Sequence, residues 1–206
     1  AVTGVDLTIT SSDPARLLVS ANPNVMGGPS AIVHVNGGET NIPIFALQAL
    51  DNSGTVQITT TATGYATDIS TVTLSPSGFV IPVLGSFTTT AFSANLSFQI
   101  ASARLQPGTL LWATNQQVRA GLTVPVSITS SDTNVGTITI SPLMFTGNVF
   151  QLPTEFDAMH AGTTTIAVAT PAGFDTPANL RQITATVTAP NITVPPNPRV
   201  GEDLQA

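Results

Sequence analysis

Few side chains in this chain of 206 residues could carry out catalysis or hold a metal ion. The sequence has no cysteine, which excludes disulfides, thiol catalysis and cysteine-ligated zinc. It also has no lysine, so a phosphate-binding loop that ends in Gly-Lys cannot form. A Ser-His-Asp triad would have to use His34 or His160. Because no Gly-x-Ser-x-Gly motif precedes a predicted helix either, the sequence predicts no enzyme.

One short segment brings together side chains that could bind a metal: Glu155, Asp157 and His160. Carboxylate oxygens suit a hard cation such as calcium. The segment lacks the Asp-x-Asp-x-Asp-Gly spacing of a calcium loop, so we expect a solvated loop before Gly162 and no cofactor. A weak or interdomain calcium site on Glu155 and Asp157 is the alternative. His34 lies in an alternating run and is predicted to be a solvent-facing strand residue.

Binding surfaces for large ligands are also scarce in the sequence. Trp112 and Tyr65 are the only residues of their kinds, too few for a sugar platform or a nucleic-acid stack. We expect Tyr65 to pack at a strand end, with Phe174 as its counterpart, and Trp112 to lie in a core or at a domain junction. The net charge of −6 opposes binding to nucleic acid or to an anionic membrane. No apolar run approaches the roughly 20 residues of a spanning helix, so no membrane insertion is expected.

The elements that would position these side chains are strands. Charged residues make up only 8% of the chain, too few to solvate the outer faces of surface helices. Short alternating segments rich in Thr, Val and Ile recur about every 8 to 12 residues between Gly, Pro and Asn turns, which is typical of a sandwich. Six or seven such segments fall in each half. The sequence therefore predicts an all-β fold with two tandem immunoglobulin-like β-sandwich domains.

Internal repetition supports this division of the chain. Ile9-Thr10-Ser11-Ser12-Asp13 recurs 119 residues later as Ile128-Thr129-Ser130-Ser131-Asp132. We expect Asp13 and Asp132 to cap equivalent turns. Two further matches follow in the same order: Gly54-Thr55 with Gly162-Thr163, and Thr71-Val72-Thr73 with Thr186-Val187-Thr188. The predicted domains are residues 1–82, which lack an opening strand, and residues 83–190.

Residues 191–206 are predicted to be a proline-rich linker followed by the opening strand of a further repeat. Residues 200–206 align without gaps on residues 118–124. If the first domain lacks its opening strand and the C-terminus carries a spare one, residues 200–206 would pair with an edge near residues 5–10 of a neighbouring molecule. That arrangement would be strand donation along a filament.

The repeated motifs resemble bacterial Ig-like repeats of the Big type, which occur in tandem in adhesins and other large surface proteins. The resemblance implies a secreted or cell-surface location and a non-enzymatic structural or adhesive role as stalk, spacer or filament subunit. The implied partners are neighbouring repeats or copies of the chain itself, with a host, surface or glycan ligand left open. The alternative is an accessory binding or spacer module of an extracellular enzyme.

Overall fold

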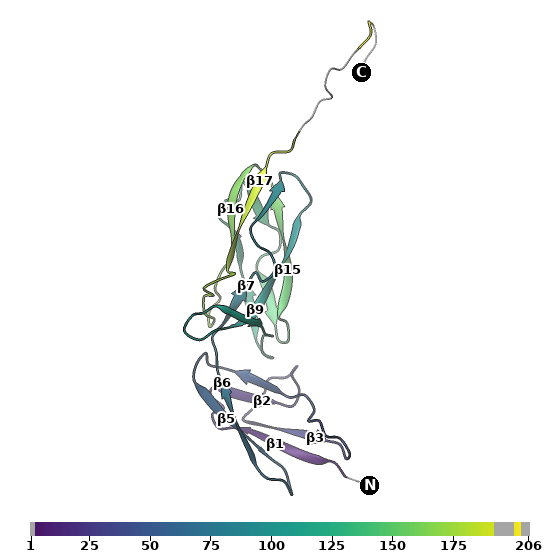
Figure 1. Ribbon diagram of the computed structural model, residues 1–206, viewed down its shortest axis with the longest axis vertical. Coiled ribbons are helices and arrows are strands. Elements are labelled where there is room, and N and C mark those ends of the chain that lie inside the picture. The colour runs from purple at the N-terminus through teal and green to yellow at the C-terminus, as the bar shows by residue number, and fades with distance from the viewer. Residues whose placement is uncertain (1–2, 192–199, 203–206) are drawn as a thin grey trace.

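Two β-sandwiches follow one another along the chain and lie end to end in the computed structural model (Figure 1). The structure describes residues 3–191 and 200–202. All regular secondary structure in these residues is strand, so the expectation of an all-β fold with two Ig-like sandwiches is confirmed. Within the same residues no helix is long and apolar enough to cross a bilayer.

The first sandwich combines a four-stranded sheet with a two-stranded one. The larger sheet has the order β3-β1-β5-β6, and the smaller pairs β2 with β4. The strands are β1 (Val5–Ser11), β2 (Leu17–Ser20), β3 (Ser30–Val35), β4 (Ala46–Ala49), β5 (Thr55–Thr61) and β6 (Asp68–Thr73).

The second sandwich has more strands in both layers. One layer has the order β12-β16-β17-β8 beside the pair β11-β14, and the other has the order β10-β9-β15-β13 with β7 also paired to β9. These strands are β7 (Ser77–Val80), β8 (Phe87–Thr90), β9 (Leu96–Leu105), β10 (Trp112–Asn115), β11 (Thr123–Val126), β12 (Ile128–Ser130), β13 (Gly136–Ile138), β14 (Leu143–Thr146), β15 (Gln151–Ala158), β16 (Gly162–Val168) and β17 (Gln182–Thr188).

The ladders of the two sandwiches match strand for strand. β1 pairs with β3 and β5, and β11 and β12 together make the same pairings with β14 and β16. The offset of 119 residues read from the sequence places Ser11 at the position of Ser130, opposite Ile58 and Ile166 respectively. β2 and β4 correspond in the same way to β13 and β15.

One of the three sequence matches is wrong by two residues. Thr55 lies opposite Thr73, and its counterpart Thr163 lies opposite Thr186. Thr71-Val72-Thr73 therefore corresponds to Thr184-Ala185-Thr186 and not to residues 186–188. A slip of two residues keeps every side chain on the same face of the sheet, so alternation alone could not detect it.

The two cores differ greatly in extent. Most buried side chains of the second sandwich form one large cluster that includes Phe79, Phe145 and Phe156, and a smaller cluster lies around Val80 and Leu105. The first sandwich has two small clusters, one around Leu17 and Val56, the other joining Ile9, Val19 and Val33. The first unit therefore buries much less apolar surface than the second.

Strand β7 belongs with the second sandwich. It pairs with β9 over Ser77–Val80, and its Phe79 lies 4.9 Å, centroid to centroid, from the ring of Phe145. The predicted first domain, residues 1–82, would include this strand. We therefore propose a boundary at residues 75–76 in place of residue 82, because the pairing and the core contacts change there.

The predicted C-terminal strand donation fits the structure only in part. Strand β1 pairs with β3 over Val5–Thr10 and with β5 over Thr8–Ser11, so residues 8–10 are paired on both sides and only residues 5–7 have a side without a partner strand among the described residues. Residues 118–122, on which residues 200–204 were aligned, are not a strand, because β11 begins at Thr123. Most of the predicted linker and opening strand, residues 192–199 and 203–206, lies outside the described residues.

Candidate functional site

His34 lies on β3 and faces solvent, as the alternating pattern predicted. Its Nδ1 is 2.6 Å from Oδ1 of Asp6, which is the residue directly opposite on β1. Cross-strand neighbours of this kind form a local surface ion pair when the histidine is protonated. His34 and His160 lie in different sandwiches, so the structure does not bring the two histidines together.

Glu155 and Asp157 lie in strand β15 and not in a solvated loop, which corrects the prediction. The run alternates: Thr154, Phe156 and Ala158 are buried, and the two acids occupy the opposite face. Oε2 of Glu155 accepts a hydrogen bond of 3.1 Å from Nδ2 of Asn95, the residue directly before β9. No group of three or more residues that could hold a metal occurs in residues 3–191 and 200–202.

The isolated aromatic residues serve different ends from those predicted. Tyr65 is exposed at a turn, whereas Phe174, its expected counterpart, packs on Phe79 with ring centroids 4.9 Å apart. Trp112 lies on β10, where it is 38% exposed and donates through Nε1 to Oδ1 of Asn115. Tyr65 is 69% exposed, so its predicted packing at a strand end is wrong. Trp112 is not a core residue, and its place at the domain junction stays a prediction.

The repeated Ser-Asp motif forms the same corner in both sandwiches. Oδ1 of Asp13 accepts from the N–H of Ala15, and Oδ1 of Asp132 accepts from that of Asn134, so the predicted capping is confirmed. The serine before each aspartate accepts through Oγ from a strand N–H. The two bonds run from Gln57 to Ser12 at 3.1 Å and from Thr165 to Ser131 at 2.9 Å. Polar contacts to the backbone explain why this motif recurs in both copies.

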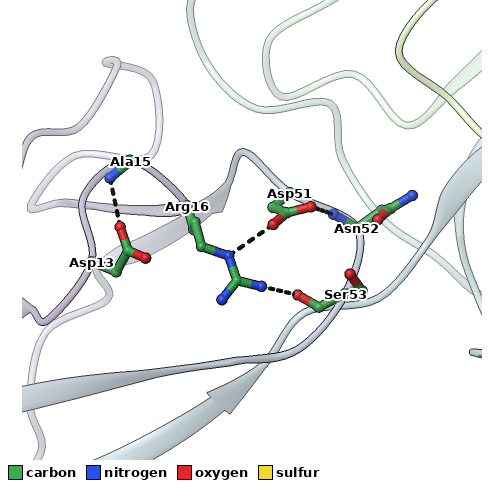
Figure 2. A network of polar contacts seen from close by, with 6 residues as sticks. All are labelled: Asp13, Ala15, Arg16, Asp51, Asn52 and Ser53. Atoms are coloured by element: carbon green, nitrogen blue, oxygen red, sulfur yellow. Dashed lines mark hydrogen bonds and ion pairs between the residues drawn. The ribbon is translucent and has the colours of Figure 1, made fainter.

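A small ion-pair network closes the corner of the first sandwich (Figure 2). Nε of Arg16 donates to Oδ2 of Asp51 at 2.7 Å, and Nη2 of Arg16 donates to the carbonyl oxygen of Ser53. The hydrogen bond from Arg16, aided by the N–H of Asn52, holds the pKa of Asp51 below its usual value. Both side chains are partly exposed, so the ion pair adds little stability and serves to order the turn.

The glycine of each Gly-Thr motif has no Cβ, which leaves space for the side chain packed against it at this corner. A Cβ on Gly54 would lie 2.7 Å from Nη2 of Arg16, and one on Gly162 would lie 2.6 Å from Cγ2 of Val135. Arg16 and Val135 are equivalent under the 119-residue offset. The motif therefore recurs because the same close approach recurs in both units.

The main difference between the copies is at strand β4. In the second sandwich β15 has a neighbour on each side, β13 and β9. Among the described residues its counterpart β4 pairs only with β2, and the open edge is defined here as the side of β4 that faces away from β2. Leu47 is 37% exposed there, whereas its counterpart Phe156 is fully buried. Ala49 is exposed and its counterpart Ala158 is buried.

A cleft of about 970 Å³ borders the open edge at the junction of the two sandwiches. Its walls include residues 46–52 of the first unit and residues 102–104, 116–120 and 122–125 of the second. Among the described residues, side-chain hydrogen bonds join two residue pairs across the junction. Nδ2 of Asn148 donates to Oδ1 of Asn24 at 2.7 Å, and Nδ2 of Asn52 donates to Oδ2 of Asp175 at 3.3 Å and to Oδ1 at 3.5 Å. No histidine is among the described residues that line the cleft, so it offers no triad of the kind considered above.

The open edge was missed in the sequence because β4 is short and follows a segment of unclear periodicity. The signal lay in the comparison of the copies. Leu47 and Phe156 are both apolar at equivalent positions, while nothing in residues 1–49 corresponds to the long apolar strand β9. Once an apolar position has no partner strand, exposure of that position follows.

No protein-family model matches the chain, and no curated protein matches it. Solved structures that match include domains 4 and 5 of the S-layer protein SbsC, at 16% identity and a TM-score of 0.42, covering 89% of this chain and 77% of that one. The D0-D1 domain of intimin matches at 10% identity and a TM-score of 0.31, covering 88% and 78%. At these identities and scores the matches assign neither family nor function.

Proposed function

We propose that this chain is a structural repeat of a bacterial surface protein, built from Ig-like units of the Big type, that acts as an extracellular stalk or spacer. The single observation that carries this proposal is the tandem arrangement of two equivalent sandwiches with a short connection of residues 74–76 between β6 and β7. A short connection limits the angles that two units can adopt.

Contacts across the junction support a mechanical role. The Asn24–Asn148 and Asn52–Asp175 bonds link loops of the two units. Met26 adds an apolar contact, since it lies against Gly121 of the second unit. Such contacts restrain bending, although each exposed hydrogen bond contributes only about 1 kcal/mol.

Small-angle X-ray scattering of the chain tests the proposal. We expect an elongated particle whose dimensions fit two sandwiches end to end. The double variant Asn52→Ala and Asn148→Ala should give a broader distance distribution, because both hydrogen bonds across the junction are removed. Asn36→Ala is the matched control, since Asn36 bonds to Glu39 within the first unit and lies outside the junction.

Two outcomes would contradict a stalk. One is a compact particle in which the units fold against each other side by side. The other is a double variant whose scattering cannot be distinguished from that of the control, which would mean that the junction contacts do not restrain the units.

A further inference from the structure

We propose that the second sandwich is built to resist tension: β7 and β8 are held in shear, and the loop between β16 and β17 locks β7 in place. This loop, residues 169–181, is called the strap loop below. The inference rests on the proposed function, because a stalk transmits force along its long axis. It names the strands that carry that force.

Force enters and leaves the second sandwich at opposite ends. β7 follows directly on residues 74–76, which connect it to the first unit, and β17 runs into residues 189–191 at the far end (Figure 1). Because the two units lie end to end, tension pulls β7 toward the first unit and β17 away from it. The load therefore reaches β7 first from one side and β17 first from the other.

The arrangement of β8 and β17 turns this load into shear. The two strands are parallel neighbours, with Phe87 opposite Ala185 and Thr90 opposite Thr188. Tension pulls β8 from its N-terminal end and β17 from its C-terminal end, so the strands are drawn past each other along their length. The evenly spaced hydrogen bonds of a parallel ladder then have to fail together and not one after another.

Further hydrogen bonds extend this ladder beyond both ends of β8. Before the strand, Oγ of Ser86 accepts from the N–H of Thr184 at 3.1 Å. After it, the N–H of Ala91 donates to the carbonyl oxygen of Thr188 at 2.8 Å. Oγ1 of Thr188 also donates to the carbonyl oxygen of Thr89 at 3.1 Å. Sliding of β8 along β17 would break all of these contacts.

β7 is held on both of its sides. On one side it pairs with β9 over Ser77–Val80. On the other side the strap loop takes the place of a strand. The N–H of Asp175 donates to the carbonyl oxygen of Ser77 at 2.8 Å, and the N–H of Ile81 donates to that of Leu180 at 2.7 Å. A force that draws β7 out must therefore break bonds to the strap loop as well as to β9.

Gly78 lets the strap loop lie close to β7. A Cβ on Gly78 would lie 2.7 Å from the carbonyl oxygen of Asp175 and 2.8 Å from Cγ of Pro177. Beside it, Phe79 of β7 packs on Phe174 of the strap loop with ring centroids 4.9 Å apart. A side chain at position 78 would push the strap loop away from β7, because neither backbone nor proline ring can yield easily.

The strap loop is itself attached to the body of the sandwich. Leu180 packs against the small cluster that contains Val80 of β7. Oδ1 of Asn179 accepts from the N–H of Trp112 on β10 at 2.8 Å. Since the loop is fixed at these points, it can hold β7 against a pull.

Pulling the second sandwich in two directions with optical tweezers tests the inference on the whole chain. The sequence has no cysteine, so pairs of cysteines can be introduced as attachment points. Ser75→Cys with Ala189→Cys loads the sandwich in shear. Ala94→Cys with Ala189→Cys lies just beyond one end of β8 and β17 and peels these strands apart. At one constant force, we expect the folded second unit to last at least about tenfold longer in shear.

Two glycine substitutions test the strap loop. In shear, Gly78→Ala should shorten the lifetime at least about fivefold, because it loosens the support of β7. When β17 is peeled from β8, the same substitution should change the lifetime by less than about twofold, because β7 then carries no load. Gly85→Ala is the matched control, since no atom of the described residues lies within 4 Å of a Cβ there. It should leave both lifetimes within about twofold of the wild type.

Equal lifetimes of the wild type in the two directions would overturn the inference, and this comparison needs no variant of β7 or the strap loop. An equal loss for Gly78→Ala in both directions would refute the strap loop as a lock, since general destabilisation would then explain the result. The scattering test of the stalk is independent of both outcomes, because scattering measures the shape of the chain without load. A compact particle whose second unit still shows direction-dependent lifetimes would contradict the stalk alone.

Discussion

The two sandwiches share one ladder, but within the described residues the second has more strands than the first. Positions that are equivalent by register differ in burial: Phe156 is fully buried, whereas Leu47 remains 37% exposed. On the other layer β17 has β8 as a parallel neighbour, while no strand of residues 3–191 takes that place beside its counterpart β6. The comparison teaches that local turns and pairings form the same way in both units, whereas core size depends on the added strands β7 to β9.

The largest difference in stability is expected when the equivalent side chains Phe156 and Leu47 are each truncated to alanine. Phe156→Ala should destabilise the second unit by about 3 to 5 kcal/mol, because it removes a buried ring from a packed core. Leu47→Ala should lower the stability of the first unit by less than about 1 kcal/mol, because the side chain is already partly in water.

Urea unfolding measures both changes. The single Trp112 reports on the second unit and the single Tyr65 on the first. Similar losses for the two variants would mean that the open edge is covered in solution.

The serine corners should behave alike in the two units. Ser131→Ala and Ser12→Ala each remove one acceptor from a strand N–H, and we expect each to lower the unfolding free energy by about 0.5 to 1.5 kcal/mol. The same urea experiment measures both. A difference of more than about 1 kcal/mol between them would contradict the view that the corner is independent of the size of the core.

The ion pair of Arg16 and Asp51 should make the stability of the first unit depend on pH in acid. The pKa of Asp51 is lower in the folded state than its usual value of 3.8, so the folded state binds this proton less readily. The resulting stability is present above that usual value and is lost as pH falls through the lowered pKa. The stability of the first unit should therefore fall more steeply in acid in the wild type than in Asp51→Asn. Parallel curves for the two proteins would contradict this linkage.

Calcium should have the smallest effect of all. Millimolar calcium is expected to shift the melting temperature of either unit by less than about 1 °C, because Glu155 and Asp157 lie apart from any third carboxylate in the described residues. A larger shift that disappears in Glu155→Gln would restore the alternative of a calcium site on β15.

Much of the fold could be predicted because it depends on short-range patterns. Alternation predicted strands, and the Ser-Asp motif predicted equivalent turns, since Asp13 and Asp132 bond to the backbone two residues ahead. The pairing partners of the strands were harder to predict from the sequence. The predicted register of β17 was wrong by two residues, and the pairing of β7 with β9 was not foreseen, because neither alternation nor composition specifies which strand lies beside which.

The candidate site was hardly predictable from single residues. Polar side chains such as Glu155 and His34 attracted attention because their types can do chemistry. The open edge instead consists of Leu47, Ala49 and the peptide groups between them, which have no distinctive residue type. It became visible only when the two units were superposed by register and one neighbour was missing.

The self-contained corner at Asp13 has a consequence for how such units evolve. Its hydrogen bonds are satisfied within a few residues and one adjacent strand, so the turn forms whether or not the outer strands are in place. Edge strands can then be lost, lengthened or exchanged between units without unfolding the centre of the sheet. Among related proteins, substitutions and insertions should therefore be most frequent in the edge strands of each sandwich. The serine and aspartate of the corner should be the most conserved residues.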